Sequence, residues 1–291
     1  MFHSRVIGTK SRNLDTFFTD GDRTRYLLAK NAGDCEIAVM DMTVVFIFQK
    51  VEDCVIESRH LGLVLPEEIP ELKNRLGKLS EILEKTLDID GILKLAGKAP
   101  ELSIPEFSDL IRKDSAFGYR SSEKVRIGVA DDEAFCFFYA DNLSLLEQMG
   151  AELVHFSPIH DTELPGDLDG LLLCGGYPEL NGKALEENQE MCSSIRKAVE
   201  GGMPCLAECG GFMYLHQEME DMEGNFRKVC GVIPGRSFRT PKLTRFGYIT
   251  LTEKKDSGLG EIPAHEFHYF DSTDCGTDFH ASVLFYIPAH F

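Results

Sequence analysis

One cysteine, Cys209, stands in a sequence context that is typical of a catalytic nucleophile. It follows a short apolar segment and precedes two glycines, after which the apolar spacing becomes helical. This order predicts the strand, sharp turn and helix of a nucleophile elbow. The strained turn needs small neighbours, which Ala207, Gly210 and Gly211 provide. The following helix would favour the Cys209 thiolate and offer backbone N–H groups to an oxyanion; the alternative is a buried core thiol.

A second glycine turn, Gly175 and Gly176, follows another apolar segment and continues as Tyr177-Pro-Glu179. If both apolar segments are parallel strands, both turns lie at the carboxyl edge of one sheet, where ligands bind in such folds. The N–H groups of this turn would then meet that of Gly210 around a tetrahedral intermediate. The alternative is an ordinary loop between a strand and a helix.

A catalytic thiol also needs a general base, and histidine is the most common one. The segment His265-Glu-Phe-His268-Tyr269 contains two histidines. On a strand they would point to opposite faces, so at most one of them would face a pocket. A structural role suits either equally well. His290 is the third candidate, and its alternative is an exposed terminal residue.

Composition and charge exclude several classes of protein. The chain is 43% hydrophobic and 27% charged, which is ordinary for a globular protein. Its net charge of -18 argues against binding nucleic acid or an anionic membrane. The nine cysteines form no Cys-x-x-Cys pair, so no zinc site is expected. With neither a secretory signal nor a membrane-spanning run, we expect a cytoplasmic protein.

The distribution of apolar segments predicts two domains, residues 1–113 and 125–291, with a polar linker over 114–124. In the second domain, strand-like and helix-like segments alternate, and the strands are continuously apolar. This predicts an α/β fold with a doubly wound, mainly parallel sheet. The expected strands are Val125–Ala130, Glu152–Phe156, Gly170–Cys174 and the segment into Cys209; the expected helices are Asn142–Gly150 and Lys183–Glu200.

Outside this alternation the pattern is less regular. After Leu215 the short pieces Lys228–Ile233 and Gly247–Leu251 suggest an antiparallel extension. In the first domain we expect helices over Arg23–Asn31, Leu72–Thr86 and Ile89–Gly97, and a strand over Cys35–Asp41.

Four segments, in order and at matching spacing, closely resemble the cobyrinate a,c-diamide synthases, glutamine amidotransferases of the cobalamin pathway. They are Phe135–Asn142, Cys174–Leu180, Ala207–Leu215 and His265–Tyr269. The resemblance covers nearly all of residues 124–281. Ser11–Asp15 and Ser58–Leu63 also look like pieces of that family's ATP-dependent synthetase domain. The resemblance implies a flavodoxin-like class I amidotransferase domain preceded by part of a P-loop-type domain.

The resemblance also implies a mechanism in two parts. Cys209 would attack the side-chain amide of glutamine and release ammonia through a glutamyl thioester. The synthetase domain would use ATP and magnesium to activate the a and c carboxylates of cobyrinate, or of hydrogenobyrinate, as acyl phosphates. Ammonia would then displace phosphate. The amidotransferase domain itself would hold no metal.

The sequence departs from the family in three places. It contains no phosphate-binding Gly-Lys-Thr loop. The strand-like Ala38–Asp41 passes directly into Met42–Gln49, where the family has an acidic, glycine-rich metal-binding segment. We therefore expect that this chain does not bind ATP by itself. Finally, the family's last strand reads Tyr-x-His-x-His, whereas Tyr286–His290 has Pro288 at the first histidine position and keeps only His290.

Three hypotheses remain at this point. The chain is an amidotransferase of this family, or a non-catalytic or glutaminase-only remnant of one, or a different cysteine hydrolase with the same elbow. The motifs around Tyr177 and His265 argue against the third.

Overall fold

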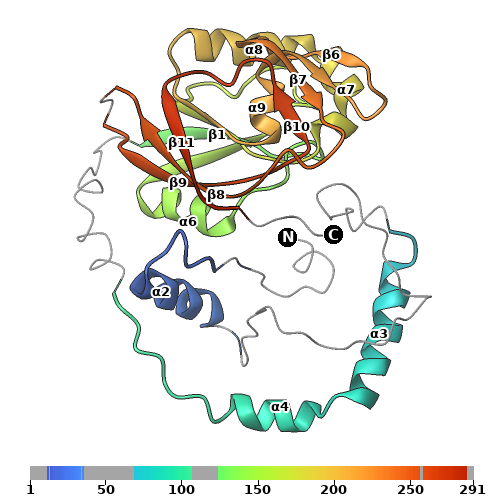
Figure 1. Ribbon diagram of the computed structural model, residues 1–291, viewed down its shortest axis with the longest axis vertical. Helices are drawn as coiled ribbons and strands as arrows, with labels where there is room; N and C mark the ends of the chain where they lie inside the picture. The colour runs from blue at the N-terminus through green and yellow to red at the C-terminus, as the bar shows by residue number, and fades with distance from the viewer. Residues whose placement is uncertain are drawn as a thin grey trace. The chain divides into compact units, whose positions relative to one another are not determined.

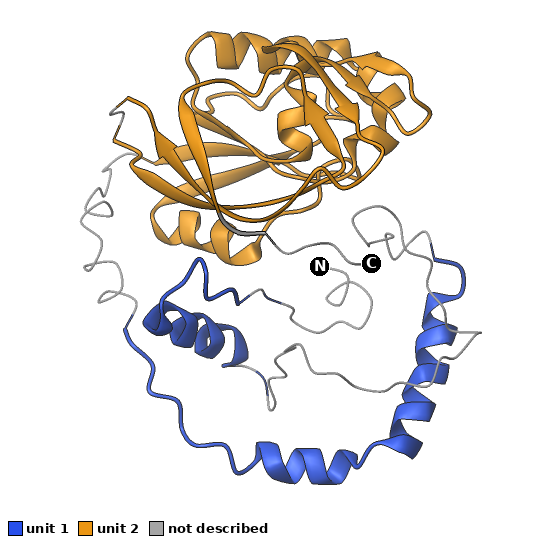
Figure 2. Cartoon of the chain, viewed as in Figure 1, with its two compact units in different colours: residues 1–118 blue, residues 119–291 orange. Residues whose placement is uncertain are grey.

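The computed structural model describes residues 12, 14–33, 35, 69–106, 124–255 and 258–286. The chain divides into two compact units, unit 1 over Met1–Gly118 and unit 2 over Tyr119–Phe291 (Figure 2). This division falls inside the segment 114–124 that the sequence assigns to a linker, although residues 107–123 lie outside the described part.

The described part of unit 1 is mainly helical. Its helices are α2 (Gly21–Ala32), α3 (Leu72–Thr86) and α4 (Ile89–Ala96), which agree with the three predicted ones. Side-chain caps define two of the starts: Asp20 accepts from the Arg23 amide at 2.8 Å, and Asp88 accepts from the Gly91 amide at 2.9 Å. Apart from Cys35, the predicted strand Cys35–Asp41 lies outside the described residues.

Unit 2 is built on a four-stranded parallel sheet in the order β2-β1-β3-β4. The strands are β1 (Val125–Ala130), β2 (Ala151–Phe156), β3 (Gly170–Leu173) and β4 (Cys205–Ala207). Figure 1 shows α6 (Ala140–Gln148) on one side of the sheet and α8 (Gln189–Glu200) on the other. The predicted α/β fold with a mainly parallel sheet is confirmed. Its carboxyl edge brings together the segments that follow Ala130, Phe156, Leu173 and Ala207.

The prediction of one helix over Lys183–Glu200 was wrong. Two helices, α7 (Gly182–Glu187) and α8, meet at Asn188. The Asn188 side chain accepts from the Met191 amide and donates to the carbonyls of Pro158, Ile159 and Asp161 at 2.9, 3.3 and 2.7 Å. A side chain that bonds the backbone in this way competes with continuation of the helix.

The rest of unit 2 is rich in β-structure. A mixed sheet has the order β10-β7-β5-β6, and an antiparallel sheet has the order β11-β8-β9. The strands are β5 (His216–Glu220), β6 (Phe226–Lys228), β7 (Ile233–Arg239), β8 (Arg245–Glu253), β9 (Glu261–His268), β10 (Phe270–Ser272) and β11 (Phe279–Tyr286).

Two predictions for this part need correction. The expected antiparallel extension is present, but it forms two separate sheets, and one pairing, β5 with β7, is parallel. The expected strand Lys228–Ile233 is interrupted: Lys228 ends β6, Ile233 begins β7, and residues 229–232 form a turn in which Gly231 has a φ of 69°. The Cys230 amide donates to the Tyr214 carbonyl at 3.1 Å, so this turn is tied to a different part of the chain.

A single hydrophobic core joins the parallel sheet to the mixed sheet. It combines side chains from the parallel strands, from α8 and from the mixed sheet, including Phe135, Leu173, Ile195, Tyr214, Met219 and Phe270. Residues that follow β4, such as Tyr214, therefore lie in the same core as side chains of the parallel sheet and of the mixed sheet.

We predict that Asn188 stabilises unit 2 through both of its functions. Asn188→Ala removes the helix cap and the three donated hydrogen bonds, and should lower the free energy of unfolding by about 1–3 kcal/mol in urea titrations. Asn188→Asp keeps the cap but cannot donate, so it should also be destabilising. Ser193→Ala, at an exposed position of α8, is the control and should change little. An Asn188→Asp variant as stable as the wild type would contradict the contribution of the donated bonds.

Candidate active site

Cys209 lies at the turn between β4 and α9 (Gly210–Tyr214), with φ 51° and ψ -110°. Left-handed backbone of this kind at a residue with a side chain costs about 1–3 kcal/mol, and it persists only where the surroundings enforce it. Here the Glu208 amide donates to the Leu173 carbonyl at 3.0 Å, and the Gly211 amide donates to the Glu208 carbonyl at 2.9 Å. The structure thus has the strand, strained turn and helix that the sequence predicts around Cys209.

The two glycines after Cys209 are needed because other groups lie where their side chains would be. A β-carbon on Gly211 would lie 2.0 Å from the Leu173 carbonyl oxygen, and one on Gly210 would lie 2.8 Å from Pro178 Cδ. Contacts below 3.0 Å of this kind force atoms to move. The start of α9 can therefore pack against the end of β3 only with glycine at these positions.

The second glycine turn packs directly against Cys209, as predicted from the shared carboxyl edge. A β-carbon on Gly175 would lie 3.3 Å from Cys209 Cβ and 3.7 Å from Cys209 Sγ. The amide nitrogen of Gly176 lies 3.2 Å from the position that a β-carbon of Gly210 would take. The Gly210 amide also hydrogen-bonds the Cys209 thiol. The Gly210 amide therefore lies at the sulfur, and the Gly176 amide lies beside Gly210.

The segment after β1 holds this second turn in place, which the sequence alone did not reveal. The Phe137 amide donates to the Gly175 carbonyl and the Tyr177 amide donates to the Ala134 carbonyl, both at 2.9 Å. The Phe137 and Tyr177 rings meet edge to face at 5.0 Å, and Tyr177 is fully buried. Tyr177 thus has a structural position beneath the loop. The family resemblance includes both Phe135–Asn142 and Cys174–Leu180, and this is the signal that could have suggested the contact between them.

The environment of Cys209 favours the thiol, which corrects the expectation of a stabilised thiolate. The side chain is accessible to solvent, but it lies in dense protein, and this desolvation raises the pKa of the Cys209 thiol. The carboxylates of Glu179 and Glu208 raise it further, and the hydrogen bond from Gly210 lowers it only in part. Glu179 is buried and Glu208 is exposed. The helix α9 is too short for its N-terminus to outweigh these effects.

The candidate bases are not placed equally well. His265 and His268 both lie on β9, on opposite faces as their spacing predicted. The His265 ring is exposed and lies 5.2 Å from the Tyr248 ring, centroid to centroid. His268 Nδ1 donates to the Phe270 carbonyl at 2.6 Å, a contact that supports the turn into β10. His290 lies outside the described residues.

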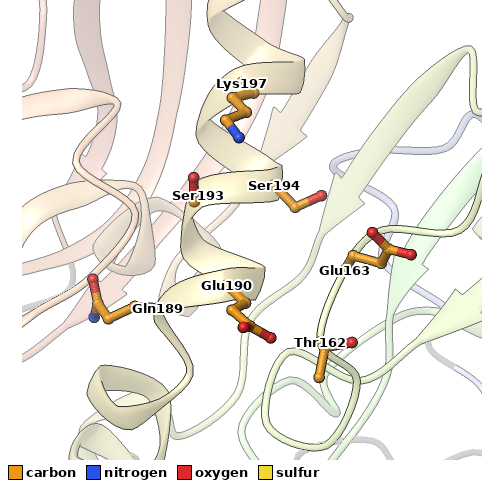
Figure 3. A pocket seen from close by; sticks show the side chains of 7 residues that line it. All are labelled: Thr162, Glu163, Gln189, Glu190, Ser193, Ser194 and Lys197. Atoms are coloured by element: carbon orange, nitrogen blue, oxygen red, sulfur yellow. The ribbon is translucent and has the colours of Figure 1, made fainter.

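One surface depression of about 680 Å³ lies away from Cys209. Figure 3 shows residues of α8 facing a loop that carries Thr162 and Glu163. The Ser194 hydroxyl accepts from the Leu164 amide at 3.1 Å and joins the two elements. None of the candidate site residues lines it; the lining residues are Thr162, Glu163, Gln189, Glu190, Ser193, Ser194 and Lys197.

The described part of the chain lacks both a metal-binding cluster and a membrane-spanning helix. No group of three or more histidine, cysteine, aspartate or glutamate side chains there is arranged to hold a metal ion. None of the helices described there combines the length and apolar character needed to cross a membrane.

A parallel sheet that ends in an elbow, with a second glycine turn against the elbow's cysteine, defines an α/β domain with the geometry of a nucleophile elbow. Comparison with known families makes this specific. Residues 126–280 match the model of the CobB/CobQ-like glutamine amidotransferase domain, and the chain belongs to this family.

Curated relatives agree with the family match. A protein named cobyrinate a,c-diamide synthase from Dehalococcoides mccartyi (strain CBDB1) is 40% identical over 222 residues, covering 75% of this chain and 47% of that protein. A protein of the same name from Caldanaerobacter subterraneus subsp. tengcongensis is 38% identical over 255 residues, covering 86% and 53%. The chain therefore spans about half the length of these relatives.

Solved structures match less closely. A structure described as a glutamine amidotransferase is 20% identical, with a TM-score of 0.39, over 52% of this chain and 75% of that one.

We predict that Cys209 is slow to alkylate at neutral pH. Alkylation by iodoacetamide requires the thiolate, so a raised pKa should move the midpoint of the pH–rate profile above the value near 8.5 of an ordinary cysteine. Glu208→Gln removes one of the two negative charges that raise the pKa, so its profile should shift to lower pH. Mass spectrometry of the Cys209 peptide gives the rates.

The control is Glu200→Gln, which removes an equally exposed carboxylate at the end of α8. It should leave the profile in place. A wild-type midpoint below that of free cysteine would contradict the desolvated thiol.

Proposed function

We propose that unit 2 releases ammonia from glutamine at Cys209. The sulfur attacks the carbonyl carbon of the side-chain amide and forms a tetrahedral intermediate. This collapses to a glutamyl thioester as ammonia leaves with a proton, and water then hydrolyses the thioester to glutamate. The observation that carries the proposal is the apposition of the strained elbow, at φ 51°, with the Gly175–Gly176 turn against the Cys209 side chain.

In this proposal the two turns stabilise the oxyanion. The Gly210 N–H lies at the sulfur and the Gly176 nitrogen lies beside Gly210, so both would donate to the substrate oxygen as it becomes negative during attack. A raised thiol pKa makes a general base important, because little thiolate is present at neutral pH. We assign the role of general base to His290. His265 and His268, which belong to the family motif His265–Tyr269, are the other candidates. Glu179 is buried, and its charge raises the pKa of the Cys209 thiol.

The acceptor is proposed from the relatives. Their name points to the a and c carboxylates of cobyrinate, or of its hydrogenobyrinate counterpart, and so to cobalamin biosynthesis. In such an amidation ATP and Mg²⁺ supply activation of the carboxylate as an acyl phosphate. This chain has no Gly-x-x-x-x-Gly-Lys-Ser/Thr loop to cradle the phosphates, so the residues present do not fit the nucleotide. A cytoplasmic setting is part of the proposal.

The second candidate function is glutamine hydrolysis without amidation, or an inactive remnant of the family. One observation favours it: the segment Tyr286–His290 has Pro288 where the family's last strand has its first histidine.

We predict that the intact chain releases glutamate and ammonia from glutamine, and that Cys209→Ala abolishes this release. The expected loss is at least about 10⁴-fold, as for removal of other catalytic nucleophiles. The control is Cys205→Ala on β4, a half-buried thiol whose pKa burial raises to about 11 and which should not take part. A folded wild-type chain that releases no glutamate would overturn the proposal in favour of the inactive remnant.

A separate prediction concerns the nucleotide. Given glutamine, ATP, Mg²⁺ and cobyrinate, the chain alone should release glutamate but form neither ADP nor an amidated corrinoid, as followed by chromatography. ADP and diamide formed by the chain alone would show that the nucleotide is bound without a phosphate loop.

A further inference from the structure

The side chain of Asp132, in the loop that follows β1, joins this loop to the one that follows β2. Its Oδ1 accepts from the Ala134 and Phe135 amides at 2.8 and 3.1 Å. Its Oδ2 accepts from the Ser157 hydroxyl at 2.8 Å and from the Ile159 amide at 2.9 Å. Both loops leave the carboxyl edge of the parallel sheet. One carboxylate therefore fixes two loops at the edge where the elbow lies.

The loop after β1 in turn supports the second glycine turn. The carbonyl of Ala134, a fully buried residue, accepts from the Tyr177 amide at 2.9 Å. A β-carbon on Gly176 would lie 2.0 Å from the same oxygen, so the turn packs directly on it. Asp132 thus holds the amide of Ala134, while the glycine turn rests on the carbonyl of that residue. A displaced carboxylate would therefore displace the Gly176 N–H as well.

The contacts of Asp132 require a carboxylate rather than an amide. The two oxygens of an ionised carboxylate offer about four acceptor positions, and the hydrogen bonds here use all of them. In asparagine one oxygen is replaced by an NH2 group, which donates. At the Oδ1 position this group would face the Ala134 and Phe135 amides, and at the Oδ2 position it would face the Ile159 amide. Either orientation leaves at least one backbone amide without its acceptor.

We propose that Asp132 is a positioning residue, which sets where the Gly176 N–H meets the substrate oxygen as that oxygen becomes negative. It acts through the loop after β1 and not on the reacting atoms. Among the described residues, the carboxylates that raise the pKa of the Cys209 thiol are those of Glu179 and Glu208. Replacing Asp132 should therefore weaken the oxyanion site while the reactivity of the sulfur stays the same. The inference rests on the proposed function, since the oxyanion forms only when Cys209 attacks glutamine.

The first experiment measures the glycine turn itself and does not depend on activity. Hydrogen exchange of the full-length chain is followed by mass spectrometry in the wild type, Asp132→Asn and Asn188→Ala. Asp132→Asn should speed exchange of the peptides that carry the Phe137 and Tyr177 amides about tenfold, because the hydrogen bonds of these amides depend on the loop after β1. Asn188→Ala is the matched control, since it frees carbonyls of residues 158–161 without touching that loop. It should leave exchange of these peptides close to that of the wild type.

Two results of this experiment contradict the proposal. One is unchanged exchange of these peptides in Asp132→Asn, and the other is an equal increase in Asn188→Ala. Ser157→Ala removes only the bond from the hydroxyl and should give a smaller increase in the same peptides. If Asp132→Asn does not fold, unchanged exchange in Ser157→Ala overturns the proposal.

The second experiment tests what the position of the turn does for the reaction. Asp132→Asn should lower kcat for glutamate release about 10–100-fold and change KM for glutamine less than about threefold, because an oxyanion donor acts mainly in the transition state. Alkylation of Cys209 by iodoacetamide forms no oxyanion, so its pH–rate profile should match that of the wild type. Asn188→Ala should keep both the wild-type kcat and the wild-type profile.

The two readouts separate positioning from a general structural role. An unchanged kcat in Asp132→Asn, or an alkylation profile that shifts together with kcat, would mean that Asp132 does not position the oxyanion site. A wild-type chain that releases no glutamate refutes the proposed function instead, and the exchange experiment then decides whether Asp132 positions the turn.

Discussion

The candidate site depends on how closely two backbone turns approach each other at the carboxyl edge of the parallel sheet. A β-carbon on Gly176 would lie 2.0 Å from the Ala134 carbonyl oxygen, and one on Gly211 would lie equally close, at 2.0 Å, to the Leu173 carbonyl oxygen. A side chain at either glycine would overlap the neighbouring backbone, so the backbone segments can pack this closely only because both residues are glycine. This packing fixes the left-handed backbone of Cys209 and brings the Gly175–Gly176 turn against its sulfur. The order of the strands matters for the same reason, since β3 and β4 are direct neighbours.

These features could be predicted from the sequence because their causes are local. Continuously apolar segments such as Gly170–Leu173 indicate buried parallel strands, and glycine pairs directly after them indicate turns that need a close approach. Parallel pairing then places the ends of β3 and β4 at one edge. The fold class and the meeting of the two turns follow from these patterns without knowledge of any distant contact.

What could not be predicted depends on residues far apart in the chain. Asn188 ends α7 because its side chain finds carbonyls of residues 158–161, which no helical periodicity reveals. The turn at Cys230 replaces an expected strand because its amide bonds the Tyr214 carbonyl. The direction of the Cys209 pKa was misjudged for a similar reason. The helix N-terminus is visible in the sequence, whereas the burial and the carboxylate of Glu179 depend on the three-dimensional surroundings.

The β-rich part of unit 2 restrains the elbow from its other end. His216 is fully buried, and its Nδ1 donates to the Phe212 carbonyl of α9 at 2.9 Å while its Nε2 lies 2.7 Å from the Ser272 hydroxyl on β10. Together with the bond from Cys230 to Tyr214, this ties the short helix to β10 and to the turn before β7. A five-residue helix cannot hold its own orientation, because an isolated turn of helix is unstable. The strained backbone at Cys209 is therefore maintained jointly, by glycine turns before the helix and by the mixed sheet after it.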